Sequence, residues 1–362
     1  MNRLQALVVS REDFATSRVI DQPLLAPADG EILLAIDRFA FTANNVTYAE
    51  TGDSIGYWKF FPAPAGWGTI PVWGFGNVVQ SRCEGVAPGE RIYGFLPMAT
   101  HLLLRPERAG PASFVDALPH RQALPPTYNF YQRCAADPAW RADLEDWQAL
   151  LRPTFFTSFL IDDWLADEGF FGAGRVLISS ASSKTAIGLA DLLYRRPGVE
   201  VIGLTSRGNL DFVARLGRYH RVLAYQELQE LKDGVATVYV DFAGSAELRR
   251  QVHGHLGERL VFSSSVGLSH RGPLGPDASL PGPKPVFFFA PDRLRKRAKD
   301  WGREGLEPRV TEPWTRFVQG AREWLTVRHA TGPAAVQAAY VEALAGRVPP
   351  DTGLVFSLHD PG

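Results

Sequence analysis

The chain has 362 residues, of which 45% are hydrophobic and 11% aromatic, so it is long and apolar enough for two folded domains. Its formal net charge of -1 gives no general attraction to nucleic acid, and two cysteines, Cys83 and Cys134, are too few for a structural zinc cluster. No apolar run reaches membrane-spanning length and no signal-peptide pattern opens the chain, so we expect a cytoplasmic globular protein.

The N-terminal third predicts mainly β-structure. Residues 31–36 form an expected strand, residues 39–53 a polar loop leading into a helical turn, and residues 71–95 two strands separated by a turn.

A segment of unusual composition follows, at 97–155. It interleaves prolines with histidines, arginines and phenols, among them Tyr128. Because Pro125 and Pro126 restrict the backbone, the segment is expected either to present donors to a substrate as a lid or to pack as an ordered insertion. For any single residue the packing interpretation is favoured.

A helix is expected around residues 155–165, with Asp162 and Asp163 on its polar side. The basic cluster 293–299 is expected to be one solvated helix face. His253 and His255 are expected on a helix surface and are too weak a signal for metal binding. The apolar run 286–290 is typical of a sheet edge or of a buried strand.

The most informative stretch, residues 174–193, predicts a strand, a turn and a helix. Val176, Leu177 and Ile178 are typical of a strand buried on both faces, and an apolar stripe with helical spacing follows from Ile187. A second strand is expected at 199–205. The unit is half of a dinucleotide-binding fold, in which the amides at the helix start bind a pyrophosphate.

The turn itself departs from the usual glycine fingerprint, since only Gly188 remains at the helix-packing position. The candidate phosphate-binding residues of the turn and first helical turn are Ser180, Ser182, Ser183, Lys184 and Thr185. Ser-Lys-Thr also resembles the end of a triphosphatase phosphate loop, but the glycines which that motif needs are absent. A dinucleotide is therefore favoured over a triphosphate.

The residues at the end of the second strand distinguish between NAD(H) and NADP(H) as the cofactor. An NAD site of this kind has an acidic residue there for the ribose hydroxyl, whereas this strand ends in Thr205, Ser206 and Arg207. Hydroxyl and guanidinium groups suit a 2′-phosphate. The sequence therefore predicts NADP(H), with Ser206 and Arg207 as its ligands.

The order of these elements resembles the medium-chain dehydrogenase/reductase superfamily, on its zinc-free, quinone-oxidoreductase-like side. Asp241 to Gly244 is similar to the family's aspartate-x-x-glycine strand end, Ser265 to Gly267 to its nicotinamide-side strand end, and 334–358 to its closing helix and strand. Residues 118–134, 155–165 and 280–291 resemble a bacterial branch catalogued only as a domain of unknown function.

The resemblance implies an α/β protein with a GroES-like β-rich catalytic domain and a Rossmann-type doubly wound parallel sheet. We expect the first at 1–155 and 320–362 and the second at 156–319, with the active site in the cleft between them. It also implies further cofactor contacts, namely Tyr225, Ala243, Gly244, Ser265, Val266 and Gly267. Members often pair through the edge of the cofactor sheet, so a homodimer is one candidate.

Candidate catalytic residues follow partly from the resemblance. The family loop carries an asparagine that contacts cofactor and substrate oxygen, equivalent to Asn44 or Asn45, although paired asparagines also form ordinary turns. Tyr48, Tyr57 and Tyr128 are phenols that can donate a proton or pack as aromatics. Enoyl-reducing relatives place their acid tyrosine where this chain has Ser54, which disfavours an enoyl thioester as substrate.

We therefore expect a zinc-independent, NADPH-dependent oxidoreductase acting on an activated C=C or a carbonyl of a small organic molecule, with no metal ligands. Two alternatives remain. One is an NADP(H)-binding sensor or structural protein with little turnover. The other is an enzyme of the same fold that performs non-redox chemistry. Neither the substrate nor the oligomeric state follows from the sequence.

Overall fold

The computed structural model of the chain describes residues 3–266 and 280–360, without the side chains of residues 303 and 304. Two compact units are present, Met1–Leu150 with Ala321–Gly362 (unit 1) and Leu151–Gly320 (unit 2). Unit 1 is therefore assembled from both ends of the chain, and unit 2 is one continuous insertion. The first boundary falls inside the long helix α2 (Glu145–Asp167).

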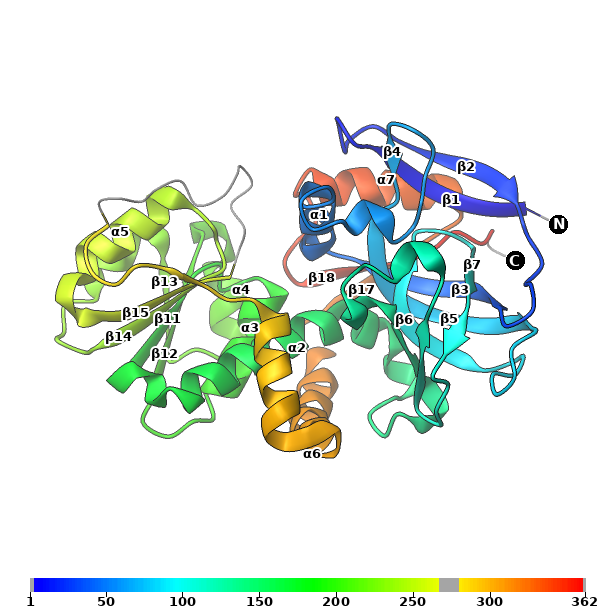
Figure 1. Cartoon of the computed structure of the whole chain (residues 1–362). Coiled ribbons are helices and arrows are strands. Elements are labelled where there is room, and N and C mark those ends of the chain that lie inside the picture. The colour runs from blue at the N-terminus through cyan, green and yellow to red at the C-terminus, as the bar shows by residue number, and fades with distance from the viewer. Residues whose placement is uncertain (1–2, 267–279, 361–362) are drawn as a thin grey trace. The chain divides into compact units, whose positions relative to one another are not determined.

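Unit 1 is β-rich (Figure 1). A small sheet has the order β2-β1-β4, and a nine-stranded sheet has the order β17-β18-β3-β5-β6-β10-β9-β8, with β7 paired to β3. The strands are β1 (Arg3–Ser10), β2 (Ser17–Pro23), β3 (Ile32–Phe41), β4 (Trp67–Gly68), β5 (Pro71–Ser81), β6 (Arg91–Pro97), β7 (His101–Leu104), β8 (Pro106–Glu107), β9 (Ser113–Asp116), β10 (Phe130–Arg133), β17 (Thr326–Thr331) and β18 (Thr352–Ser357). Helices α1 (Ala43–Glu50) and α7 (Pro333–Leu344) accompany them.

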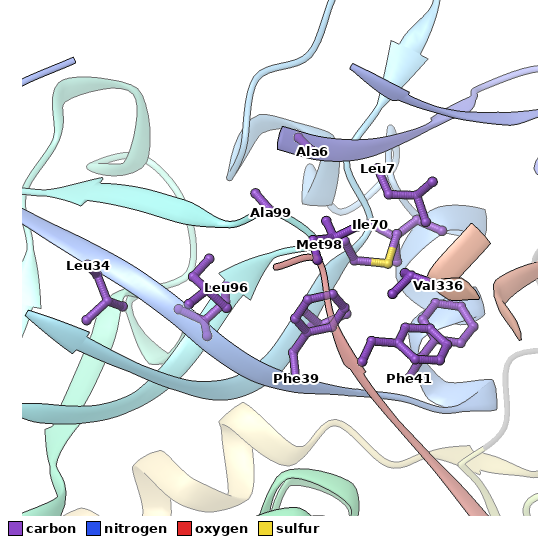
Figure 2. Packing of buried hydrophobic residues seen from close by; sticks show 14 of the residues in the cluster. Ala6, Leu7, Leu34, Phe39, Phe41, Ile70, Leu96, Met98, Ala99 and Val336 are labelled. Carbon is purple, nitrogen blue, oxygen red and sulfur yellow. The ribbon is translucent and has the colours of Figure 1, made fainter. Parts of the chain in front are cut away.

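The core of unit 1 joins the two chain ends. Figure 2 shows Phe39 and Phe41 of β3 beside Val336 of α7, in a cluster that also includes Leu7 and Met98. The ring of Phe41 stacks on Phe356 of β18, with 5.9 Å between centroids. The last strand is thus a central part of the sheet, because it lies between β17 and β3.

Unit 2 contains a six-stranded parallel sheet with the order β13-β12-β11-β14-β15-β16. Its strands are β11 (Arg175–Ile178), β12 (Glu200–Thr205), β13 (Arg221–Ala224), β14 (Thr237–Asp241), β15 (Leu260–Ser265) and β16 (Val286–Phe287). Its helices, besides α2, are α3 (Lys184–Leu193), α4 (Leu210–Arg215), α5 (Ala246–Leu256) and α6 (Ala290–Ala321). The strand order reverses at β11, which is the doubly wound arrangement expected from the sequence.

Gly188 is the position in α3 where close packing requires glycine. A Cβ there would lie 2.9 Å from the Ser158 hydroxyl oxygen of α2. The Ser158 hydroxyl also donates to the Thr185 carbonyl, at 2.7 Å. Gly188 therefore lets α2 approach the first turns of α3.

Two expectations about charged groups are wrong. Arg293 and Arg297 of α6 are each only 7% exposed, because both donate to the Asp163 carboxylate of α2 at 2.7 Å. The basic cluster is therefore only partly solvated. His253 of α5 is fully buried, with Nε2 3.0 Å from the Ser263 hydroxyl of β15. Both expectations failed because the partners lie on other elements.

Strand β16 is the edge of the sheet, and Val286 and Phe287 are 43% and 45% exposed. Among the described helices, none is both long and apolar enough to cross a membrane.

Candidate functional site

The turn between β11 and α3 lies at the carboxyl edge of the parallel sheet, where this fold binds its ligands. Ser180 has a φ of 48°, in the left-handed region that glycine usually occupies. Ser183 is the N-cap of α3, and its hydroxyl accepts from the Ala186 amide at 3.3 Å. Lys184 and Thr185 begin the helix, and the amides of a first helical turn have no intrahelical acceptor.

Contacts from neighbouring segments hold this glycine-poor turn in place. The Ala181 amide donates to the Leu204 carbonyl of β12 at 3.0 Å, and the Tyr219 hydroxyl donates to the Ala181 carbonyl at 2.9 Å. The Asn209 side-chain amide donates to the Ser182 hydroxyl at 3.0 Å. Sequence patterns gave no sign of Tyr219 or Asn209, because each acts through a partner more than 25 residues away.

Gly203 of β12 leaves room for Ala181 of the turn and for the Tyr219 ring to pack against β12. A Cβ at that position would lie 2.9 Å from the Ala181 Cβ and 2.9 Å from the Tyr219 ring. The missing glycine in the turn is therefore accompanied by a glycine in the neighbouring strand.

A buried charged group fixes the end of β14. The Asp241 carboxylate accepts from the amides of Ala243 at 3.0 Å and Gly244 at 3.1 Å, and from the Arg249 guanidinium at 2.9 Å. It also accepts from the Ser179 hydroxyl at 2.9 Å, at the end of β11. Ser179, which follows β11 directly, and the Ala243–Gly244 backbone are thus hydrogen-bonded to one carboxylate.

The end of β12 is exposed and carries the groups predicted for a 2′-phosphate. Ser206 is exposed, and the Arg207 side chain is 68% exposed and forms an ion pair with Glu227 at 3.1 Å. Glu227 also accepts from the Ala224 amide, at the end of β13. Tyr225 beside it is half-buried. The sequence-based description missed Glu227, whose carboxylate stands 20 residues from Arg207 along the chain.

The end of β15 completes this edge of the sheet. Ser265 is buried and its carbonyl accepts from the Phe288 amide at 2.9 Å. The Val266 amide donates to the Asp241 carbonyl at 2.9 Å. Gly267 lies outside the described residues.

In unit 1, the three candidate phenols form one cluster (phenol cluster: Tyr48, Tyr57 and Tyr128). The hydroxyls of Tyr57 and Tyr128 are hydrogen-bonded at 2.8 Å, and the rings of Tyr48 and Tyr57 have centroids 4.6 Å apart. The Trp73 indole donates to the Tyr48 hydroxyl at 3.3 Å, and the nearby Asn44 side chain lowers the pKa of that phenol. Residues from α1 and from the 97–155 segment therefore meet.

The two asparagines have different surroundings. The Asn45 side chain is buried, accepts from the Thr42 amide at 2.8 Å, and donates to the Pro71 carbonyl at 2.9 Å. Asn45 therefore holds the start of α1 on β5, while Asn44 is half-buried beside the phenol cluster. Of the two, Asn44 is the one whose side chain contacts another candidate residue.

Burial controls the ionisation of the phenol cluster. It raises the pKa of Tyr48 and of Tyr57 above that of a free phenol, and their phenol neighbours raise each pKa further. The Tyr128 pKa is raised well above the ordinary value, first by burial and then by Tyr57. All three hydroxyls are therefore protonated at neutral pH and can act as donors.

A fully buried arginine, Arg121, binds the backbone of Tyr128. The Arg121 guanidinium donates to the Asp116 carboxylate at 2.8 Å, to the Tyr131 hydroxyl at 2.8 Å, and to the Tyr128 carbonyl at 2.9 Å. A further bond reaches the Asn129 side chain at 3.0 Å. Burial raises the pKa of the Tyr131 phenol to about 12. The segment 97–155 is thus an ordered part of unit 1 at this point.

The candidate residues consequently form two groups, cofactor candidates around the sheet edge of unit 2 and donors in unit 1. Within residues 3–266 and 280–360, no three histidine, cysteine or acidic side chains are grouped so that they could hold a metal ion.

A β-rich unit built from both chain ends, with a second unit that contains a six-stranded doubly wound sheet inserted between them along the sequence, is the architecture of a medium-chain dehydrogenase/reductase, so the fold expected from the sequence is confirmed. The chain belongs to the family described as a protein of unknown function, DUF2855, whose model matches residues 39–349. The predicted resemblance to a family catalogued as a domain of unknown function is thereby confirmed.

Solved structures share this fold at low sequence identity. CurA from Vibrio vulnificus in complex with NADPH is 13% identical with a TM-score of 0.62, over 99% of this chain and 100% of that one. The quinone oxidoreductase from Coxiella burnetii is 14% identical with a TM-score of 0.54, over 98% and 99%. The human synaptic vesicle membrane protein VAT-1 homolog-like protein is 15% identical with a TM-score of 0.58, over 100% of both chains. No curated protein matches the sequence.

Proposed function

We propose that the protein is an NADPH-dependent oxidoreductase that needs no zinc and reduces an activated C=C or a carbonyl of a small organic molecule. The observation that carries the proposal is the sheet edge of unit 2. There, the first turn of α3 follows β11, and an exposed serine and arginine follow β12. The neighbours of the same fold, which include a complex with NADPH, support it.

The residues present fit the cofactor by the chemistry of their donors. Ser182, Lys184 and Thr185 would hold the pyrophosphate at the start of α3, where the helix dipole favours an anion. Ser206 and Arg207 would hold the 2′-phosphate, which replaces Glu227 as a partner of the guanidinium. That replacement costs little, because ion pairs this exposed contribute about 0 to 1 kcal/mol.

The remaining cofactor candidates have supporting places in the same site. Ala243 and Gly244 would present their backbone beside the nicotinamide half, on the turn that Asp241 fixes. Tyr225 would contact the adenosine end, and Ser265 and Val266 the nicotinamide end. Ser180 and Ser183 would shape the turn, since one has a left-handed backbone and the other caps α3.

The bound cofactor would supply a hydride, and the chain would supply orientation and proton donors. In unit 1, Tyr48 and Tyr128 would donate hydrogen bonds to a substrate oxygen, because phenols are protonated at neutral pH and burial raises the pKa of both further. Tyr57 would replenish Tyr128 through their hydroxyl contact of 2.8 Å. Asn44 would orient the Tyr48 hydroxyl, and Asn45 would act only by holding α1.

Titration of the purified protein with NADPH and with NADH, followed by nucleotide fluorescence, tests the proposal. We expect NADPH to bind more tightly, and Arg207→Glu to weaken NADPH by at least about tenfold more than NADH, since a charge-assisted contact is replaced by repulsion. Lys232→Glu, an exposed lysine on the loop before β14, is the control for the change in charge. Absence of binding of both nucleotides by the wild-type protein would refute the proposal.

A second candidate function is a cofactor-binding protein with little turnover. It is favoured by the burial of the phenols and by the hydrogen bond that two of them form with each other. A panel of enones, quinones and aldehydes distinguishes the two functions. NADPH oxidation with any of them supports the enzyme, and tight binding without oxidation supports the second candidate.

A further inference from the structure

We propose that Asn209 is a positioning residue that couples the 2′-phosphate subsite to the pyrophosphate subsite, so that binding at one organises the other. The inference rests on the proposed function, because it assigns a device to the same cofactor site. Its basis is one hydrogen bond of 3.0 Å, from the side-chain amide of Asn209 to the Ser182 hydroxyl.

Asn209 belongs to the segment that carries the 2′-phosphate ligands. Residues Arg207–Asn209 form one turn of 3₁₀-helix that begins at Ser206. The backbone N–H of Asn209 donates to the Ser206 carbonyl at 2.9 Å and closes that turn. The backbone that carries Ser206 and Arg207 and the side chain that reaches Ser182 thus belong to one hydrogen-bonded turn.

Ser182 belongs to the other subsite. It lies in the turn after β11, one residue before the N-cap Ser183, and is partly exposed. A serine hydroxyl has one proton and two lone pairs, so accepting from Asn209 leaves its own O–H to donate to a phosphate oxygen. Asn209 therefore sets the direction in which Ser182 donates.

The composition of the turn explains why such a support matters here. A glycine-rich turn approaches the pyrophosphate with its backbone, whereas this turn presents side chains whose rotamers must be fixed. Tyr219 fixes the turn backbone through the Ala181 carbonyl, from a position outside the segment 206–209. The side-chain hydrogen bond of Asn209 joins the turn directly to the segment carrying the 2′-phosphate ligands.

The coupling is measurable with cofactor fragments, without turnover. The probes are 5′-AMP, which lacks the 2′-phosphate, and adenosine 2′,5′-bisphosphate, which has it. Their ratio of dissociation constants, measured by isothermal titration calorimetry, is the gain in affinity that the 2′-phosphate provides. We expect Asn209→Ala to reduce this gain at least about fivefold, the lower end of typical coupling between sites.

Two further variants separate coupling from simple support of the turn. Ser182→Ala removes the acceptor of the same hydrogen bond and should reduce the gain equally, so it replaces Asn209→Ala if that variant does not fold. Tyr219→Phe should weaken both probes by a similar factor and leave their ratio unchanged. Thermal unfolding and circular dichroism establish that each variant is folded.

The outcomes are distinct. An unchanged ratio in Asn209→Ala and Ser182→Ala, with the bisphosphate still bound, would overturn the coupling and leave the proposed function intact. If the ratio of dissociation constants fell equally in Tyr219→Phe, the coupling would also be overturned, because any disturbance of the turn would then reduce the gain from the 2′-phosphate. Failure of the wild-type protein to bind the bisphosphate and NADPH would overturn both proposals.

Discussion

Replacing Arg121 with methionine should destabilise unit 1 severely. The side chain is completely buried and Asp116, its carboxylate partner at 2.8 Å, is 1% exposed. Methionine keeps most of the volume but leaves the carboxylate without its cation. Removal of one partner of a buried ion pair typically costs about 3 to 5 kcal/mol. With a denaturant slope of about 2 to 3 kcal/mol per M, the urea midpoint should fall by about 1 to 2.5 M.

The pH dependence gives the sharper measurement. Burial raises the Asp116 pKa, and the Arg121 guanidinium opposes this rise. Without Arg121 the pKa of the Asp116 carboxyl in the folded protein rises further. A carboxyl whose pKa is higher in the folded than in the unfolded state stabilises the fold at pH values below its unfolded pKa, and this stabilisation is lost as the pH rises through its folded pKa. The difference in unfolding free energy between wild type and Arg121→Met should therefore be larger at pH 8 than at pH 5.

Urea unfolding followed by tryptophan fluorescence at both pH values measures these differences. Arg82→Met is the matched control, because Arg82 forms an ion pair with Asp29 whose side chains are 59% and 88% exposed. Such a pair contributes about 0 to 1 kcal/mol, so the control should shift the midpoint little. A loss below about 1 kcal/mol for Arg121→Met, or a loss that grows toward acid pH, would refute the reasoning.

Three other changes test the sites. Glu227→Gln frees the Arg207 guanidinium from an exposed partner, so NADPH should bind up to about fivefold more tightly and NADH unchanged in a fluorescence titration; an equal shift for both would contradict it. Gly203→Val pushes against Ala181 and should cost about 1 to 3 kcal/mol in thermal unfolding while weakening both nucleotides, and unaltered stability would exclude the proposed crowding. Tyr128→Phe should lower kcat by about a hundredfold without changing the NADPH dissociation constant, and an unchanged kcat would remove the phenol from the mechanism.

The sequence was sufficient to predict the first strands and the first helix of the parallel sheet in unit 2. Val176 to Ile178 and the apolar stripe from Ile187 specify β11 and α3, because burial on both faces and helical spacing are local patterns. Local chemistry also indicated Ser206 and Arg207 at the end of β12. The predictions of these strands and of the helix succeeded because the information lies within a few consecutive residues, while the cofactor role of Ser206 and Arg207 stays a prediction.

The partners of those residues could not be predicted. Asn209, Tyr219 and Glu227 matter through hydrogen bonds across 20 to 38 residues, and nothing in their neighbours along the chain marks them. Burial of Arg293 likewise depends on Asp163, 130 residues earlier. Only the folded chain shows which distant polar groups meet, because a single sequence carries no record of pairing.

The position of β18 affects how the protein can fold during synthesis. Unit 2 consists of residues that leave the ribosome consecutively, so its parallel sheet can form while the C-terminal segment is still being made. Unit 1 cannot close at that stage, because β18 separates β17 from β3 and pairs with a strand made more than 300 residues earlier. Until β18 is made, the apolar face of β3, including Phe39 and Phe41, lacks its final neighbours, so unit 1 depends on contacts of very long sequence separation, which form slowly.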